Sequence, residues 1–309
     1  MSLFLQFAFL LSVILFCAKA AGYLSVRIGQ PSVLGELIAG ILLGPSLLNL
    51  LGFSFIEHSL AETIKLLGEL GVLLLMFLAG LELHLDELKE NMHIAALSGT
   101  FGVVGPVLLG WGIGALFGMT TPAAIFLGLT LGATSVSISA QTLIELKALR
   151  TRVGLGLLGA AVFDDILIIL LLSVFLAFQG GGASGGIGIL WIIVRMALFV
   201  LASFLFGMRI LPWIIRQVSK LQISQGLLVA TLALMLVYSI ASEYFGGLAA
   251  ITGAFIAGLM LARTPEKERI ETGVHSLAYG LFVPVFFVNI GLSINLRTFP
   301  MQALLFTLV

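Results

Sequence analysis

The sequence predicts an all-α, polytopic membrane protein, organised as an inverted-repeat secondary transporter with discontinuous helices. Three observations lead to this prediction: the composition, a series of long apolar segments, and the recurrence of two of those segments later in the chain. Of the 309 residues, 60% are hydrophobic and only 10% are charged, and the mean hydropathy is +1.19. Soluble domains carry about 25% charged residues, so this chain has too few polar side chains to cover a globule in water.

Apolar segments long enough to cross a bilayer recur along the whole chain. A transmembrane helix needs about 20 mostly apolar residues, and an eleventh such segment begins near residue 301. The first segment contains Ala-Lys-Ala (18–20), which resembles a signal-peptide cleavage site, but no basic residues precede that segment, so we expect an uncleaved helix. The ten complete predicted spans are 3–24, 33–50, 62–82, 94–117, 122–144, 153–178, 187–212, 225–243, 245–262 and 274–294.

The basic residues predict the orientation of these spans. Most of the 15 Lys and Arg residues lie in or beside the connections that follow the odd-numbered spans. Only Lys65 and Arg297 lie on the opposite side, and Arg195 falls within the seventh span. Because Lys and Arg concentrate on the cytoplasmic side, we predict a multi-pass protein of the cell membrane with its N-terminus outside. The zero net charge gives no basis for a nucleic-acid partner, and the single cysteine excludes an intrachain disulfide and a cysteine metal site.

Two apolar segments recur in the same order. IAGILLGPS (38–46) in the second span returns as IAGLMLART (256–264) in the ninth. MFLAGLELHL (76–85) in the third returns as FFVNIGLSINL (286–296) in the tenth. By the charge distribution, the members of each pair cross the membrane in opposite directions, as in inverted-repeat transporters. Chance similarity between Gly- and Leu-rich helices is the alternative. A second repeat as long as the first would end at about residue 390. We therefore expect three further helices, most of them beyond Val309.

The sixth span contains two adjacent carboxylates in the apolar run GAAVFDDILIIL (159–170). Asp164 lies roughly 17 Å along the helix from the start of the span, and half of the hydrocarbon core is about 15 Å thick, so the pair lies near the midplane. A charge there costs at least about 3 kcal/mol, and two neighbouring carboxylates resist simultaneous ionisation. A fixed ion pair within the bundle is the alternative. We predict instead that Asp165 and Asp164 bind ions and protons, because a carboxylate that holds either a proton or a cation can exchange one for the other.

The fifth span supplies hydroxyl groups at the same depth. It reads LGATSVSISAQTL (131–143), and the hydroxyl side chains after Gly132 weaken the helix and can satisfy freed backbone groups. We therefore predict a break that adds Thr134 and Ser135 to the site, with an alkali cation, such as Na⁺, held by Asp165, Asp164 and Thr134. Ser137 and Glu69 are secondary candidates, for which helix packing is the alternative. No cofactor is predicted, since Na⁺ and H⁺ are the transported ions.

Five segments together resemble the bacterial Na⁺/H⁺ antiporters of the NapA type, in the second group of monovalent cation:proton antiporters. The resemblance covers essentially the whole chain and is most specific at the Asp-Asp pair and the Thr-Ser break. The segments are QPSVLGELIAGILLGP (30–45), LGELGVLLLMFLAGLEL (67–83), LGATSVSISAQTL (131–143), GAAVFDDIL (159–167) and VPVFFVNIGLSINL (283–296).

This resemblance implies a thirteen-helix homodimer that works by an elevator-like movement. Asp165 matches the essential ion- and proton-binding residue, Asp164 the residue that pairs with a lysine on the eleventh span, and Thr134–Ser135 the unwound helix. Such an Asp pair implies electrogenic exchange. The implied divisions are dimerisation domains at 1–92 and 219–298, core segments at 93–180 and 299–309, and a linker helix at 181–218.

The predicted function is exchange of Na⁺ or Li⁺ for H⁺ by a transporter, not an enzyme. A K⁺/H⁺ antiporter of the potassium-efflux type is the nearest alternative. In such proteins, however, the sixth span has a Gln-Asp pair in place of Asp-Asp, and a cytosolic nucleotide-binding domain is present. A sodium-coupled organic-solute symporter on a related fold is a further alternative. An intramembrane aspartyl protease is excluded, because adjacent helical residues point about 100° apart and cannot face each other across a shared water.

Overall fold

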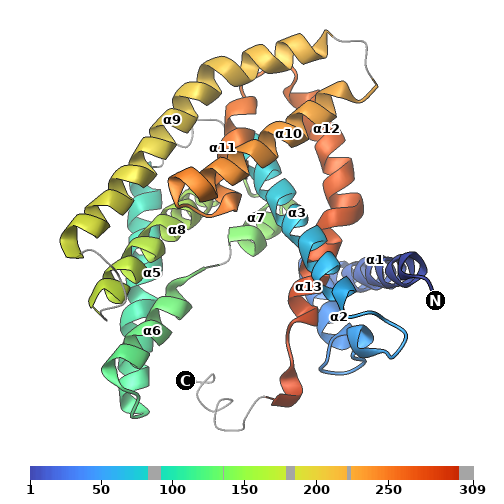
Figure 1. Ribbon diagram of the computed structural model, residues 1–309, viewed down its shortest axis with the longest axis horizontal. Coiled ribbons are helices and arrows are strands. Elements are labelled where there is room, and N and C mark those ends of the chain that lie inside the picture. Colours follow the sequence, from blue (N-terminus) through green and yellow to red (C-terminus); the bar gives the residue numbers. More distant parts are fainter. Residues whose placement is uncertain (83–91, 135, 179–184, 221–223, 299–309) are drawn as a thin grey trace. The chain divides into compact units, whose positions relative to one another are not determined.

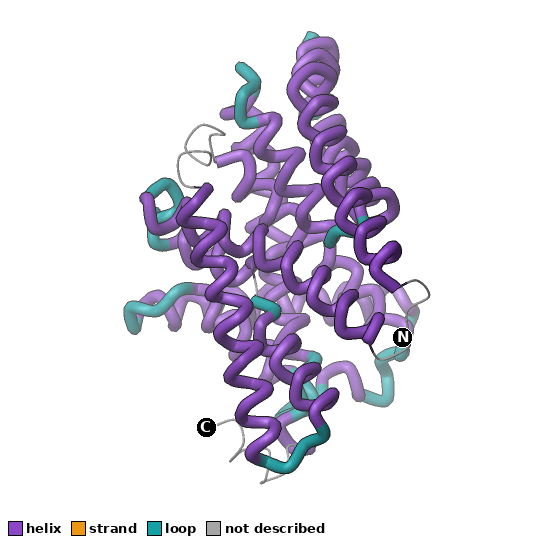
Figure 2. Tube along the Cα trace, turned by 90° about the vertical axis from the view of Figure 1, so that its left-hand side faces the viewer, coloured by secondary structure: helices purple, strands orange, loops and turns teal. Residues whose placement is uncertain are grey.

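The computed structural model describes residues 1–82, 92–134, 136–178, 185–220 and 224–298. Within these residues the regular structure is helical and no strand occurs, as Figure 2 shows. The chain divides into two compact units, one formed by Met1–Leu75 and Thr272–Val309 and the other by Met76–Glu271. The dimerisation, core and linker divisions implied by the family resemblance are functional ones, and they stay a prediction.

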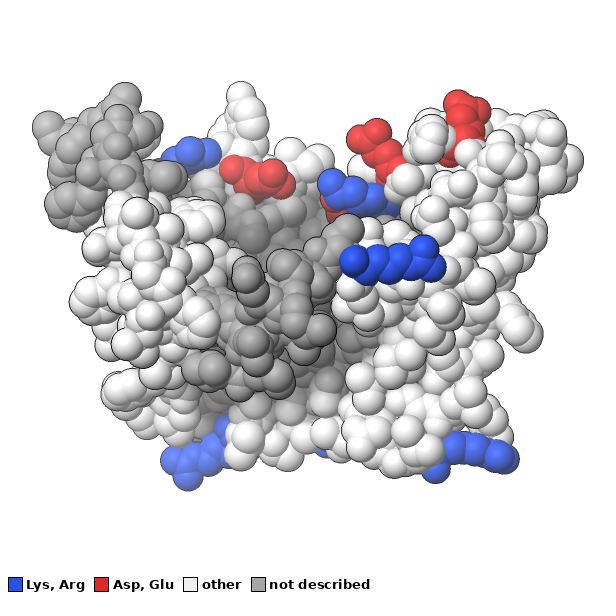
Figure 3. Space-filling model, turned by 90° about the horizontal axis from the view of Figure 1, so that it is seen from below, with Lys and Arg blue, Asp and Glu red and all other residues white. Residues whose placement is uncertain are grey.

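The predicted spans are found as helices in the predicted order. Among the described residues, 7 helices are long and apolar enough to cross a membrane, and 3 further apolar helices are shorter. On the face drawn in Figure 3, uncharged side chains prevail, and most of the Lys, Arg, Asp and Glu residues lie near its upper and lower margins. The apolar helices and the absence of strands among the described residues confirm the all-α membrane fold class predicted from the sequence. The candidate membrane spans, which differ slightly in extent from the labelled helices below, are Leu3–Arg27, Ser59–Glu82, His93–Leu116, Arg152–Leu172, Leu190–Ser219, Gly226–Gly246 and Lys267–Leu292. The shorter apolar helices are Ser32–Leu43, Thr121–Gly132 and Ala250–Leu261.

Some predicted boundaries need correction. The second span was predicted to reach residue 50, but its helix ends at Leu43. Gly44 adopts an extended conformation before Pro45, since proline disfavours the helical conformation in the residue that precedes it. The tenth span was predicted to begin at residue 274, but the helix already begins at Lys267. Its first turns are polar, so hydropathy alone does not detect them.

The first unit has a core between three helices, α1 (Leu3–Arg27), α2 (Ser32–Leu43) and α13 (Val283–Leu292). It also holds the 3₁₀ turn η1 (Leu50–Gly52), most of α3 (Ser59–Glu82), the end of α12 (Lys267–Leu277), the π-helical turn η3 (Ala278–Phe282) and the 3₁₀ turn η4 (Leu296–Thr298). Apolar side chains spaced by about one turn on α1 are fully buried, which places one face of that helix against the core. The core residues of the three helices are Leu10, Ile14, Ala18, Ala39, Leu43, Val285, Val288 and Leu292.

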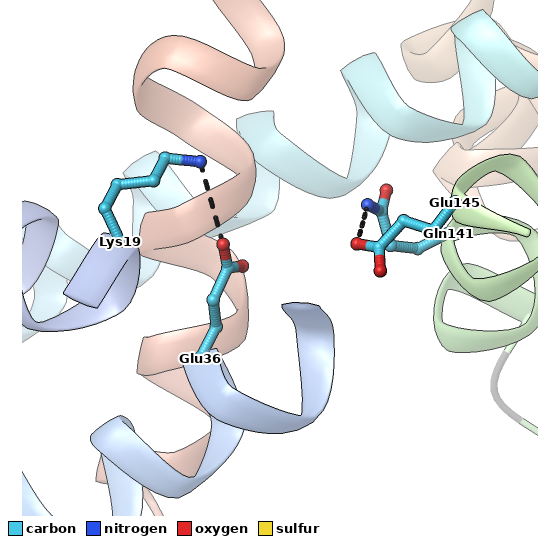
Figure 4. Close-up of polar contacts among 4 residues, drawn as sticks. All are labelled: Lys19, Glu36, Gln141 and Glu145. Atoms are coloured by element: carbon cyan, nitrogen blue, oxygen red, sulfur yellow. Dashed lines mark hydrogen bonds and ion pairs between the residues drawn. The ribbon is translucent and has the colours of Figure 1, made fainter. Parts of the chain in front are cut away.

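Polar contacts hold the ends of the same three helices together. The Lys19 ammonium lies 3.7 Å from a carboxylate oxygen of Glu36, joining α1 to α2, as Figure 4 shows. The Ser46 hydroxyl donates to the carbonyl of Ile294 at 2.8 Å, and Arg297 donates to the carbonyls of Ser46 and Leu47. The loops that follow α2 and α13 are therefore bonded to each other.

The second unit contains the remaining helices, shown in Figure 1. One group has α5 packed against both α6 and α8, and another has α10 packed against α9 and α11. Arg195 of α9 donates to the carbonyls of Tyr244 and Phe245 in the π-helical turn η2, which satisfies carbonyls at the end of a helix. The bounds are α5 (Met92–Leu116), α6 (Thr121–Gly132), α7 (Val136–Glu145), α8 (Arg152–Phe178), α9 (Gly185–Ser219), α10 (Gly226–Ala241), η2 (Ser242–Gly246) and α11 (Ala250–Leu261).

Glycines from the recurring sequence segments make matching close contacts in each unit. In the first unit, Gly40 of α2 lies against the backbone of Val288 and Gly291 in α13. In the second unit, Gly258 of α11 lies against the backbone of Phe77 in α3. Gly40 and Gly258 occupy the same place in the two IAG segments, and α2 and α11 both have 12 residues. This correspondence supports the predicted inverted repeat, which stays a prediction.

Candidate functional site

The fifth predicted span is two helices with a break between them. The first helix, α6, ends at Gly132, and Ala133 has the extended backbone angles φ −77° and ψ 102°. The second helix, α7, begins at Val136. The glycine and the hydroxyl-bearing segment after it predicted this discontinuity, and the expectation is confirmed. Ser135 lies outside the described residues, as does the side chain of Ser137, so their predicted roles stay predictions.

The two aspartates lie near the middle of α8, which extends from Arg152 to Phe178. The helix places them in different surroundings, because successive side chains point about 100° apart. Asp164 is buried, with 6% of its surface exposed. Asp165 is only half-buried. The two carboxylates predicted near the midplane thus differ in burial, and Asp164 occupies the more buried position.

Thr134 connects the broken helix to the aspartates. Its hydroxyl donates to the carbonyl of Gly132 at 3.5 Å, at the outer limit of hydrogen-bonding distance. It also lies close enough to the carboxylate of Asp164 to interact with it. The structure therefore brings together three predicted site groups, the two aspartates and Thr134.

Two glycines of α5 form the other side of this site, and the sequence alone did not identify them as site residues. A methyl group at Gly99 would lie 2.9 Å from Oδ1 of Asp164, and one at Gly102 would lie 3.5 Å from Oδ2 of the same side chain. Asp164 is thus packed directly against the α5 backbone. The available signal was the spacing of two glycines by three residues in SGTFG (98–102), which places both on one face of a helix.

A buried polar residue that the sequence alone did not identify lies on α7. Gln141 is 3% exposed, and its amide donates to a carboxylate oxygen of Glu145 at 2.8 Å, as Figure 4 shows. Both residues belong to the half-helix that follows the break. A buried amide needs such a partner, so this bond helps to fix the half-helix.

Glu69 has a different local environment: its side chain is exposed and pairs with a lysine of the same helix. Its carboxylate lies 3.9 Å from the ammonium of Lys65 one turn earlier on α3, and its side chain is 57% exposed. Exposed pairs of this kind contribute about 0–1 kcal/mol to stability. The predicted secondary proton role of Glu69 stays a prediction.

The groups assembled at the break suit a hard monovalent cation and a proton. They are two carboxylates, one hydroxyl and the carbonyls freed where α6 ends, and such oxygen ligands line the ion sites of transporters with discontinuous helices. Within the described part of the chain, no three His, Cys, Asp or Glu side chains come together. The chemistry available here is reversible binding of a proton or a cation by the same carboxylate.

Comparison with known proteins places this arrangement in a family. The family described as "Sodium/hydrogen exchanger, transmembrane" matches residues 11–309. The "Probable Na(+)/H(+) antiporter GerT" of Bacillus cereus is 42% identical over 291 residues, which cover 94% of this chain and 75% of GerT. The "Na(+)/H(+)-K(+) antiporter GerN" of the same species is 43% identical over 293 residues, covering 94% of this chain and 72% of GerN.

A solved structure shares the fold. The sodium proton antiporter MjNhaP1 from Methanocaldococcus jannaschii at pH 8 aligns with a TM-score of 0.68 and 18% sequence identity, over 99% of this chain and 75% of that one. The resemblance to cation:proton antiporters inferred from the sequence is confirmed, while its NapA type stays a prediction. The relatives are transporters and not enzymes, and this chain is a multi-pass membrane protein that belongs to the sodium/hydrogen exchanger family.

Proposed function

We propose that this cation/proton antiporter exchanges Na⁺ or Li⁺ for H⁺, with Asp165 as the carboxylate that binds the cation and the proton in turn. One observation carries the proposal: two carboxylates lie near the middle of an apolar helix, and the buried one contacts Thr134 at a helix break. A carboxylate at membrane depth is a functional site by default. The half-buried position of Asp165 supports its assignment as the group that the cation reaches.

The exchange follows from competition for one carboxylate. A cation and a proton each neutralise the negative charge, and the two cannot occupy the same oxygens together. Binding of one must therefore release the other, and each lowers the apparent affinity for the other by the same factor. When the loaded site then opens to the opposite side of the membrane, the two ions move in opposite directions.

The relatives guide the choice of cation. GerT is named as a Na⁺/H⁺ antiporter, and GerN as a Na⁺/H⁺-K⁺ antiporter. We propose Na⁺ as the main cation, since hydroxyl, carbonyl and carboxylate oxygens suit a small hard ion. The similarity to GerN keeps K⁺ as the second candidate.

Further features follow from the family resemblance inferred from the sequence. We propose an elevator-like movement in a homodimer, with the N-terminus outside the cell. Asp164 would pair with a lysine on a later span and release it when a proton or cation binds nearby. Two carboxylates that together carry more protons than cations per cycle would make the exchange electrogenic.

The test is transport by the full-length protein in proteoliposomes. A proton gradient is imposed, and its dissipation on addition of Na⁺, Li⁺ or K⁺ is followed with a pH-sensitive dye. Asp165→Asn keeps the shape of the side chain but removes its charge, so we expect loss of exchange with a normal size-exclusion profile. Exchange at the wild-type rate in this variant would overturn the assignment of Asp165.

A further inference from the structure

The closest approach of α5 to the aspartates occurs at Gly99. A methyl group there would lie 2.9 Å from three atoms at once: the carbonyl oxygen of Ala160, Oδ1 of Asp164 and a ring carbon of Phe163. Contacts shorter than about 3.4–3.5 Å are repulsive for carbon. One of the three atoms belongs to the α8 backbone and cannot move alone. Only glycine therefore allows α5 to lie this close to α8.

Gly102, one turn further along α5, is in a different situation. A methyl group there would lie 3.5 Å and 3.7 Å from the two carboxylate oxygens of Asp164. Both are ordinary van der Waals distances. The two glycines face the same side chain, but the geometry forbids a methyl group only at Gly99.

One carboxylate oxygen of Asp164 is enclosed where α5 packs against α8. Its Oδ1 is buried and receives no hydrogen bond from the residues that the structure describes. Asp164 as a whole is 6% exposed, whereas Asp165 on the same helix is half-buried. A buried carboxylate oxygen without a donor is unfavourable while it is charged, and on the side of Gly99 there is no room even for a methyl group.

We infer that Gly99 is a positioning residue for the exchange proposed above: it holds the α5 backbone against Asp164, so that Oδ1 is closed to a hydrated cation on that side. Asp165 is the more exposed of the two carboxylates. The two carboxylates are thereby separated into a shielded position and a position that a hydrated cation can enter. The separation is made by a glycine on a neighbouring helix and not by the chemistry of the aspartates, which is identical.

The first test compares Gly99→Ala with Gly112→Ala in the full-length protein. Both changes add one methyl group to a glycine inside α5, so effects on helix propensity cancel. We expect Gly99→Ala to lower Vmax/KM for Na⁺ by at least about tenfold, since a displacement of about 1 Å at a reacting group can cost a hundredfold. We also expect it to shift the pH profile of exchange, because displacement of α5 admits water to Asp164. Gly112→Ala, where a methyl group meets no atom within 4 Å, should stay within about twofold of the wild type, with an unchanged pH profile.

Equal behaviour of the two glycine variants would overturn the inference. Size-exclusion profiles and melting temperatures of both variants establish that each is folded. If Gly99→Ala does not fold, a second measurement decides the question without that variant.

The second test measures access to the two positions by thiol chemistry. Cys17, the one cysteine among residues 1–309, is first replaced by Ser, together with any cysteine elsewhere in the full-length protein. Asp164→Cys and Asp165→Cys are then treated with a small, water-soluble methanethiosulfonate reagent. We expect the thiol at position 165 to react and the thiol at position 164 to react at least about tenfold more slowly, since a buried thiol is inert. Equal rates would overturn the inference. This assay needs no transport, so a wild-type protein without exchange activity would overturn the proposed function and leave the result on access standing.

Discussion

Removal of the Thr134 hydroxyl is the perturbation that best separates ion binding from helix packing. Thr134→Val keeps the shape of the side chain and removes one oxygen. The contact of this hydroxyl with the carbonyl of Gly132 is 3.5 Å long and contributes little. In the proposed site this hydroxyl oxygen is a ligand of Na⁺, and an interaction of a polar group with a charged one contributes about 1.5–3 kcal/mol.

The expected effect on transport follows from that free energy. Each 1.4 kcal/mol is about a factor of ten in affinity, so Thr134→Val should raise the apparent KM for Na⁺ by about 10- to 150-fold. The assay is Na⁺-driven dissipation of a pH gradient in proteoliposomes over a range of Na⁺ concentrations. Thr130→Val is the matched control, because the Thr130 hydroxyl, on α6 one turn before the break, donates to the carbonyl of Phe126 at 2.9 Å in its own helix. Equal KM values for the two valine variants would refute the reasoning.

Two further predictions concern α3 and the glycine contacts. Gly258→Ala should lower the melting temperature relative to Gly112→Ala, because a methyl group at Gly258 meets the backbone of Phe77 and Leu81, whereas one at Gly112 meets no atom within 4 Å. Overpacking of this kind costs about 1–3 kcal/mol, or about 2–12 °C for a protein of this size; equal melting temperatures in detergent would contradict the close contact of α3 and α11. Glu69→Gln should leave exchange within about twofold of the wild type, because the side chain is exposed and makes only a surface pair with Lys65. A loss of activity in that variant would instead support a proton-relay role for Glu69.

The sequence predicted the order of the helices because hydrophobic length is a strong local signal. It also predicted the break at Thr134, since a glycine followed by hydroxyl side chains is unusual in an apolar helix. The depth of Asp164 and Asp165 followed from the helical rise alone. These features depend on residues that lie close together in the sequence.

Features that depend on distant residues were not predicted. The role of Gly99 depends on the close packing of α8 against α5, and hydrophobic patterns do not indicate which helices pack together. The partners of Arg195 lie in the π-helical turn η2, and single-turn π segments have no reliable sequence pattern. Which of the two aspartates is the more buried is set by the rotation of α8 about its axis, and that rotation follows from packing.

Proton release on cation binding tests the central claim most directly. Purified full-length protein in weakly buffered detergent solution is mixed with Na⁺, and the change in pH is followed with an indicator dye, with choline as the control cation. Competition for Asp165 predicts that Na⁺ releases protons from the wild-type protein and not from Asp165→Asn. Binding of Na⁺ to the wild type without proton release, or equal release by the variant, would contradict the account.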